Sequence, residues 1–119
     1  MSAMNVRIYH NPRCSKSRQT LQLLTDRGIE PEIIEYLDSP PDAATLLELA
    51  GSLGIPVREL VRTGEDDYKA NRDEVDALDA AALAGWMAAH PRVIQRPIVV
   101  SAKGARVGRP PDTVLEILD

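Results

Sequence analysis

The chain has 119 residues, of which 44% are hydrophobic and 27% charged, a balance typical of one compact globular domain over residues 1–119. Its formal net charge of −4 argues against general binding of nucleic acid. The sequence holds no run of the roughly 18 apolar residues that a membrane span needs, and no signal-peptide segment, so we expect a soluble, cytoplasmic protein.

The chain contains a single cysteine, Cys14, which excludes an internal disulfide, a Cys-x-x-Cys redox pair and a cysteine-rich zinc site. We expect no bound metal and no bound cofactor. Most basic residues are arginine, since lysine occurs only at positions 16, 69 and 103. Arginine binds oxyanions through paired hydrogen bonds, but a GC-rich genome would give the same bias, so the positions of the arginines must decide.

The first third of the chain predicts a strand–helix–strand unit. Residues 5–10 alternate apolar and polar side chains, as a short strand does, and residues 32–37 predict a second strand. The segment between them predicts a helix that ends at Gly28 and carries an apolar stripe of Leu21, Leu23 and Leu24. Such a unit places its two strands in parallel.

The middle of the chain, about residues 40–92, predicts a helical insert. Its first helix begins near Asp42, after two prolines, and one face of this helix carries Leu46, Leu47, Leu49 and Leu53. A second short helix is expected from Pro56 to about Gly64, and residues 66–78 are expected to be irregular or partly helical.

The insert ends with a helix that stops before Pro91. We expect Trp86 in the core of the insert and His90 at the end of this helix. After it, residues 96–101 predict a strand, and residues 105–108 predict its hairpin partner.

The last predicted element is a helix that begins at a proline and carries the apolar residues Val114, Leu115 and Leu118. The predicted order is therefore β-α-β, a helical insert, and β-β-α. This is the α/β arrangement of thioredoxin, with a mixed four-stranded sheet.

Cys14 falls between the first strand and the first helix, where unpaired backbone N–H groups and the helix dipole stabilise an anion. Positive charges in the same loop lower the pKa of a thiol further, and they come from Arg13, Lys16 and Arg18. His10 ends the strand, and Ser17 offers a hydroxyl group within the same turn. Because ligands bind at the carboxyl ends of parallel strands, this position predicts a reactive thiol.

Two kinds of thiol site do not fit the loop. A Cys-x5-Arg phosphatase loop needs an arginine six positions after the cysteine, whereas Arg18 follows four positions after Cys14. A dithiol redox site needs a second cysteine, but Ser17 stands three residues after Cys14. An adduct on Cys14 must therefore be resolved by a thiol from outside the chain.

The stretch "IYHNPRCSKSRQTL" resembles the His-Asn-Pro-x-Cys-x-x-Ser-Arg signature of the ArsC family, the glutaredoxin-linked arsenate reductases. It is most similar to the branch whose loop reads "HNPRCSKSR", in which Ser15 and Lys16 follow the cysteine. The likeness continues, in the family's order, through "EYLDSPP", "VRELVR", "RPIVV" and "VGRPP". It implies a thioredoxin-like fold with a helical insert.

The resemblance also implies roles for individual residues. Cys14 would attack the arsenic of arsenate, and His10 and Ser17 would tune its thiolate. The oxyanion would be held by Arg62, Arg96 and Arg109. Structural roles near the site would fall to Asn11, Pro12, Arg18 and Pro97. Glutathione would be the co-substrate and glutaredoxin the partner protein.

Pro97 directly follows Arg96, and thioredoxin-like proteins carry a cis-proline beside their active thiol. We therefore predict a cis peptide bond between Arg96 and Pro97, although only about 5–6% of X–Pro bonds in folded proteins are cis.

Two other interpretations stay open. A thiol enzyme of the same fold could act on glutathione mixed disulfides. Alternatively, the Spx-type transcription regulators share this fold and bind RNA polymerase, but those proteins usually carry a Cys-x-x-Cys switch, and Ser17 replaces its second cysteine here.

Overall fold

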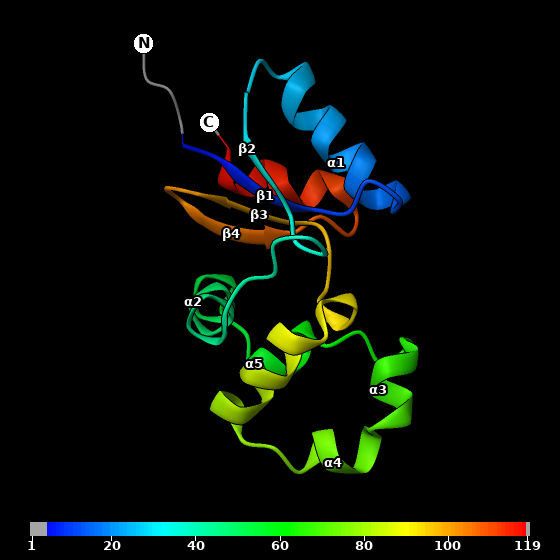
Figure 1. Ribbon diagram of the computed structural model, residues 1–119. Coiled ribbons are helices and arrows are strands. Elements are labelled where there is room, and N and C mark those ends of the chain that lie inside the picture. Colours follow the sequence, from blue (N-terminus) through cyan, green and yellow to red (C-terminus); the bar gives the residue numbers. More distant parts are fainter. Residues whose placement is uncertain (1–4, 119) are drawn as a thin grey trace. The chain divides into compact units, whose positions relative to one another are not determined.

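The computed structural model describes residues 5–118, and the chain forms two compact units (Figure 1). The first unit combines the described residues up to Ser39 with those from Arg96 onward, and the second spans Pro40–Gln95. Within residues 5–118, no helix combines the length and the apolar character needed to cross a membrane.

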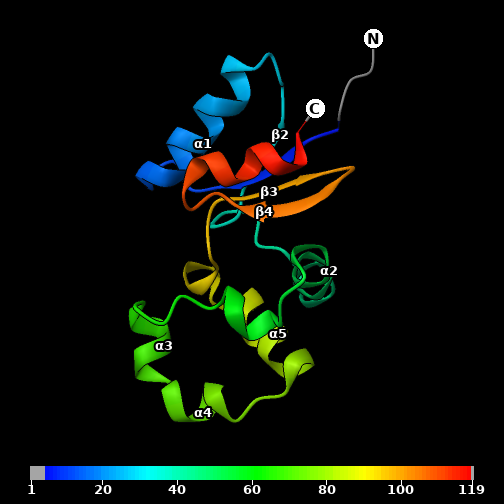
Figure 2. The ribbon, with the colours of Figure 1, turned by 180° about the vertical axis from the view of Figure 1, so that it is seen from behind.

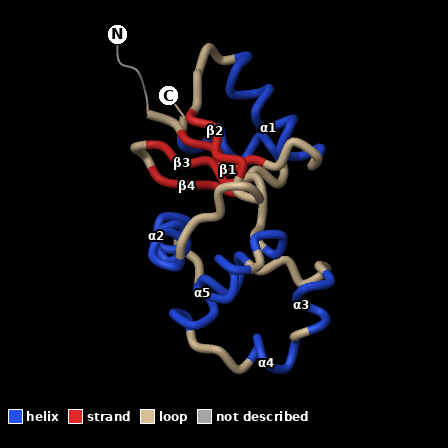
Figure 3. The backbone as a smooth tube through the Cα atoms, viewed as in Figure 1, coloured by secondary structure: helices blue, strands red, loops and turns tan. Residues whose placement is uncertain are grey.

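The first unit is built on a four-stranded sheet in the order β2-β1-β3-β4 (Figure 3). Its strands are β1 (Arg7–His10), β2 (Glu32–Glu35), β3 (Ile98–Ser101) and β4 (Gly104–Val107). β1 pairs in parallel with β2 and antiparallel with β3, and β3 pairs antiparallel with β4. The mixed four-stranded sheet is therefore confirmed.

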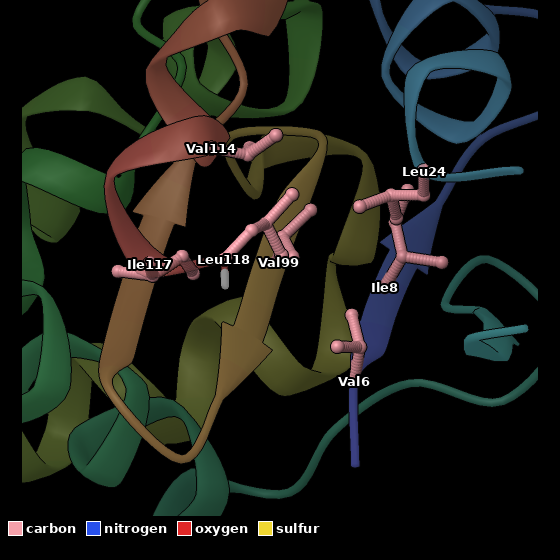
Figure 4. Packing of buried hydrophobic residues seen from close by; sticks show 7 residues of the cluster. All are labelled: Val6, Ile8, Leu24, Val99, Val114, Ile117 and Leu118. Atoms are coloured by element: carbon pink, nitrogen blue, oxygen red, sulfur yellow. The ribbon is translucent and has the colours of Figure 1, made fainter. Parts of the chain in front are cut away.

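Two helices cover one face of this sheet, α1 (Ser15–Asp26) and the 3-10 helix η3 (Pro111–Ile117), as both ribbon views show (Figures 1 and 2). α1 ends two residues before Gly28, whose φ of 76° lies in the left-handed region that glycine favours. Helices and strands bury a shared aliphatic core (Figure 4), which consists of Val6, Ile8, Leu24, Val99, Val114, Ile117 and Leu118.

Of the three apolar residues expected on the C-terminal helix, two are buried and one is not. Val114 and Ile117 are buried, and so is Leu118, but Leu115 is 39% exposed and does not belong to the core. The reason is the 3-10 geometry of η3, in which side chains three residues apart lie on the same face. Val114 and Ile117 share that face, and Leu115 is turned away from it.

The second unit is entirely helical apart from one isolated β-bridge between Val61 and Ile94. Its elements are α2 (Ala43–Leu53), η1 (Val57–Leu60), α3 (Asp66–Ala70), α4 (Arg72–Asp76), α5 (Ala80–Ala89) and η2 (Pro91–Val93). The segment predicted as partly helical thus forms two short helices. The prediction of a helix from Pro56 to Gly64 is wrong in its second half. The observed helix η1 ends at Leu60, and Val61 then pairs with Ile94.

α2 and α5 pack against each other through small and aliphatic side chains, which include Leu46, Leu49, Ala50, Leu83, Ala84 and Met87. Leu47 is not part of this face and is 38% exposed, because consecutive helical residues point about 100° apart. Trp86 is only half-buried and stacks on the ring of His90, with the ring centres 4.4 Å apart. Trp86 is therefore not a fully buried core residue, whereas its neighbour Met87 is.

Candidate active site

Cys14 is the N-cap residue of α1, at the point where the chain turns after β1. Its backbone N–H donates to the carbonyl oxygen of Asn11 at 3.0 Å, and its own carbonyl oxygen accepts from the N–H of Arg18 at 3.0 Å. The residue is half-buried and its backbone is extended, as is usual for an N-cap. The thiol therefore stands where the first free N–H groups of the helix point outward.

The surroundings of Cys14 stabilise its thiolate form. Burial by itself raises the pKa of the thiol, since the charged form loses hydration. Hydrogen bonds from the backbone N–H groups of Ser17 and Lys16, together with the hydrogen bond and the charge of Arg96, oppose burial and bring the pKa below its ordinary value. The lowered pKa favours the thiolate, which is the nucleophilic form of a cysteine.

His10 and Ser17 form a buried pair directly behind the thiol loop. The Nδ1 atom of His10 lies 2.6 Å from the Oγ atom of Ser17, which also accepts a hydrogen bond of 3.0 Å from the backbone N–H of Asn11. Burial lowers the pKa of His10, the charge of Arg18 lowers it further, and the carboxylate of Glu35 opposes both. In the neutral tautomer of His10 that carries its hydrogen at Nε2, the Nδ1 atom accepts the hydroxyl hydrogen of Ser17.

The loop is held in shape by its own side chains. The Oδ1 atom of Asn11 accepts from the backbone N–H of Arg13 at 2.9 Å. One guanidinium nitrogen of Arg18 donates to the carbonyl oxygen of Pro12, also at 2.9 Å. These two hydrogen bonds brace the loop that carries Cys14.

Arg96 and Arg109 lie on two chain segments that are joined at one end of the β3–β4 hairpin. The Arg96–Pro97 peptide bond is cis, which confirms the prediction, and the Arg109–Pro110 bond is cis as well. The guanidinium of Arg109 donates to the carbonyl oxygen of Arg96 over 3.4 Å. Since Arg96 also bonds Cys14, the first unit gathers the thiol and two of the predicted oxyanion ligands.

Arg62 belongs to the second unit, where its backbone N–H donates to the carbonyl oxygen of Val93 at 2.6 Å. Its assignment to the oxyanion site stays a prediction. No group of three His, Cys, Asp or Glu side chains within residues 5–118 is arranged to hold a metal ion.

Two residues behind the site are not predicted by the sequence patterns. Thr20, on α1, is fully buried, and Gly108, directly before Arg109, packs against it so closely that an added side chain would overlap. The only signal in the sequence is the glycine within "VGRPP", because contacts between such distant residues leave no local pattern.

A parallel strand pair, an antiparallel hairpin and a lone activated thiol at the strand–helix loop define a thiol protein of the thioredoxin-like class. The chain belongs to the ArsC family, whose model matches residues 9–117. It is 52% identical over 114 residues to YfgD, an uncharacterized protein of Escherichia coli K12, with 95% of this chain and 96% of that protein covered.

Two further relatives carry the name of an enzyme. The arsenate reductase of Haemophilus influenzae is 48% identical over 117 residues, with 97% of this chain and 100% of the relative covered. The solved structure of arsenate reductase from Vibrio cholerae superposes with a TM-score of 0.93 at 49% identity and covers 98% of this chain and 100% of its own.

Proposed function

We propose that this protein is an arsenate reductase whose nucleophile is Cys14. The observation that carries the proposal is the thiol itself, which is held at the start of α1 by two backbone N–H groups and by Arg96. The similarity to proteins named arsenate reductase in Haemophilus influenzae and Vibrio cholerae supports the choice of substrate.

In the first step the Cys14 thiolate attacks the arsenic atom of arsenate. A sulfur–arsenic bond forms, an arsenic–oxygen bond breaks, and the displaced oxygen leaves as water after protonation, so arsenic stays in the As(V) state. Arg96 and Arg109 neutralise the negative oxygens and orient the substrate for this attack. Arg62 is the proposed third ligand, and this assignment rests on the family resemblance.

His10 and Ser17 are proposed to act on the thiol through the loop and not through the substrate. The hydroxyl group of Ser17 is committed to the His10 ring on one side and to the N–H of Asn11 on the other. This fixes the third residue of α1, whose backbone N–H bonds the sulfur. The pair therefore holds the anion-binding N–H groups in place.

Reduction requires thiols from outside, since Cys14 is the only cysteine of the chain. Glutathione bonds to the arsenic of the adduct with loss of a second water molecule. A glutaredoxin thiolate then attacks the glutathione sulfur and forms a mixed disulfide, while the electron pair of the broken sulfur–arsenic bond stays on arsenic and makes it As(III). Hydrolysis of the remaining bond releases arsenite and restores the Cys14 thiol.

The proposal is tested by measuring arsenite formation with glutathione and glutaredoxin present. The parent protein should form arsenite, Cys14→Ser should form none, and Ser52→Ala, an exposed serine on α2, should match the parent. In parallel, the release of glutathione from a mixed disulfide substrate is followed. If the protein catalyses that release and yields no arsenite, the substrate class is wrong although the thiol assignment is right.

A further inference from the structure

Gly108 stands at the junction that carries both arginines of the first unit. Its backbone N–H donates to the carbonyl oxygen of Pro97 at 2.9 Å, and the next N–H, of Arg109, donates to the carbonyl oxygen of Val107 at 2.9 Å. On the opposite strand, Ile98 pairs with Val107. The positions of Arg96 and Arg109 are therefore set by one small hydrogen-bonded segment.

Because Gly108 has no side chain, the backbone of this segment lies directly against α1. A Cβ atom at position 108 would lie 2.5 Å from the Oγ1 atom of Thr20, 3.2 Å from its Cγ2 atom and 2.8 Å from the Cγ atom of Pro97. Non-bonded carbon atoms pack at about 3.5–4.0 Å, so no side chain fits. The glycine is needed for close approach, since its φ is not in the left-handed region.

The two neighbours of Gly108 cannot move away easily. Thr20 is fully buried, and its hydroxyl group donates to the carbonyl oxygen of Lys16 at 2.8 Å. Pro97 is also buried, and its ring leaves it no rotatable side chain. Added volume at position 108 would therefore displace the backbone and not a side chain.

The contact between Gly108 and Thr20 is connected to the Cys14 thiol through the first turn of α1. Thr20 bonds the carbonyl group of Lys16, and the backbone N–H of Lys16 bonds the sulfur of Cys14. Gly108 thus touches the helix that carries the nucleophile, while its own segment carries Arg96 and Arg109. The distance between sulfur and guanidinium groups depends on how closely the two backbones approach each other.

We propose that Gly108 is a positioning residue, which sets the separation between Arg96, Arg109 and the Cys14 sulfur through its contact with Thr20. The inference rests on the proposed function insofar as these groups bind arsenate. No chemical step passes through Gly108. A side chain at this position pushes the arginine segment away from α1, which weakens the hold on the thiolate and on the oxyanion together.

The test compares Gly108→Ala with Gly51→Ala, because a Cβ atom at position 51 would meet no atom within 4 Å. In Gly108→Ala we expect the pKa of Cys14, measured from its alkylation rate against pH, to rise toward that of a free thiol. The KM for arsenate should rise on the order of tenfold to a hundredfold, as for small misplacements of binding groups. Gly51→Ala should keep both values.

A second variant separates positioning from folding. Thr20→Ala combined with Gly108→Ala removes the contacts at 2.5 and 3.2 Å and leaves the one at 2.8 Å with Pro97. We expect smaller shifts of the same sign. If Gly108→Ala does not fold, these shifts in the double variant support the inference. A double variant that also fails to fold contradicts the inference. A parental Cys14 pKa and a parental KM for arsenate, in whichever variant folds, contradict it as well.

The two proposals fail in different ways. The alkylation pKa is measured without arsenate, so a raised pKa in Gly108→Ala supports the positioning role even if the parent forms no arsenite. Conversely, a parent that forms arsenite, together with a Gly108→Ala variant that keeps the parental pKa and KM, overturns the positioning role and leaves the function standing.

Discussion

The helices of this protein begin in two different ways. α2 and α5 begin at aspartates, where the side chain of Asp42 accepts from the N–H of Thr45 and that of Asp79 from the N–H of Ala82, both at 2.8 Å. α1 begins at Cys14, which makes no conventional side-chain cap, and its first turn holds no acidic residue. The backbone N–H groups of Lys16 and Ser17, in the first turn of α1, instead lower the pKa of the Cys14 thiol.

The difference shows how one physical feature serves stability in one place and chemistry in another. A helix N-terminus favours an anion, and a carboxylate provides one permanently. A thiol provides one only by losing its proton, so the same N–H groups lower its pKa and make it reactive. The start of α1 therefore lacks a strong side-chain cap and carries a nucleophile in its place.

The largest effect is expected when Cys14→Asp makes the start of α1 resemble that of α2. Arsenite formation should fall to the uncatalysed rate because no nucleophilic sulfur remains. The free energy of unfolding should rise by about 1 kcal/mol, since aspartate is a far better N-cap. Urea unfolding and an arsenite assay measure both. A less stable variant would contradict the comparison between the two helix starts.

A smaller loss of activity is expected for Arg96→Lys. Lysine keeps a positive charge but loses the planar guanidinium that bonds the sulfur, so the pKa of Cys14 should rise. Arsenite formation should drop on the order of a hundredfold, as for the loss of one donor to a reacting oxyanion. Arg27→Lys, at an exposed arginine after α1, is the matched control and should behave as the parent. Equal rates in both variants would remove Arg96 from the site.

The smallest effect on activity is expected for Asp79→Ala, which removes the cap of α5. The free energy of unfolding should fall by about 1 kcal/mol because the N–H of Ala82 loses its acceptor. The rate per folded molecule should stay at the parental value. A changed KM for arsenate in this variant would show that the start of α5 serves more than stability.

Local patterns in the sequence predict the framework of the fold well. Gly28 and the leucine stripe locate α1, and alternating residues locate β1, because these signals lie within a few residues of the element that they describe. The C-terminal helix was only partly predictable. Whether it is an α-helix or a 3-10 helix decides the side on which Leu115 falls, and that depends on packing against the sheet.

The candidate site also has features that local sequence patterns predict and features that they do not. The place of Cys14 at a helix start follows from strand and helix patterns, and the cis bond before Pro97 followed from a family resemblance. The contact between Gly108 and Thr20 could not be predicted, because it joins residues far apart in the chain through backbone geometry. The bridge at Val61 escaped prediction for the same reason.

The pH dependence of Cys14 alkylation, with and without arsenate, tests the central claim most directly. The pKa of the Cys14 thiol is lowered in the folded protein. The thiolate, and the stability that it contributes, should therefore persist below the pKa of about 8.5 of a free cysteine. Both should be lost as the pH falls through the pKa of the thiol in the folded protein. We predict alkylation with a pKa below that of free cysteine, and protection by arsenate. A pKa at or above the free value, with no protection, would contradict the account.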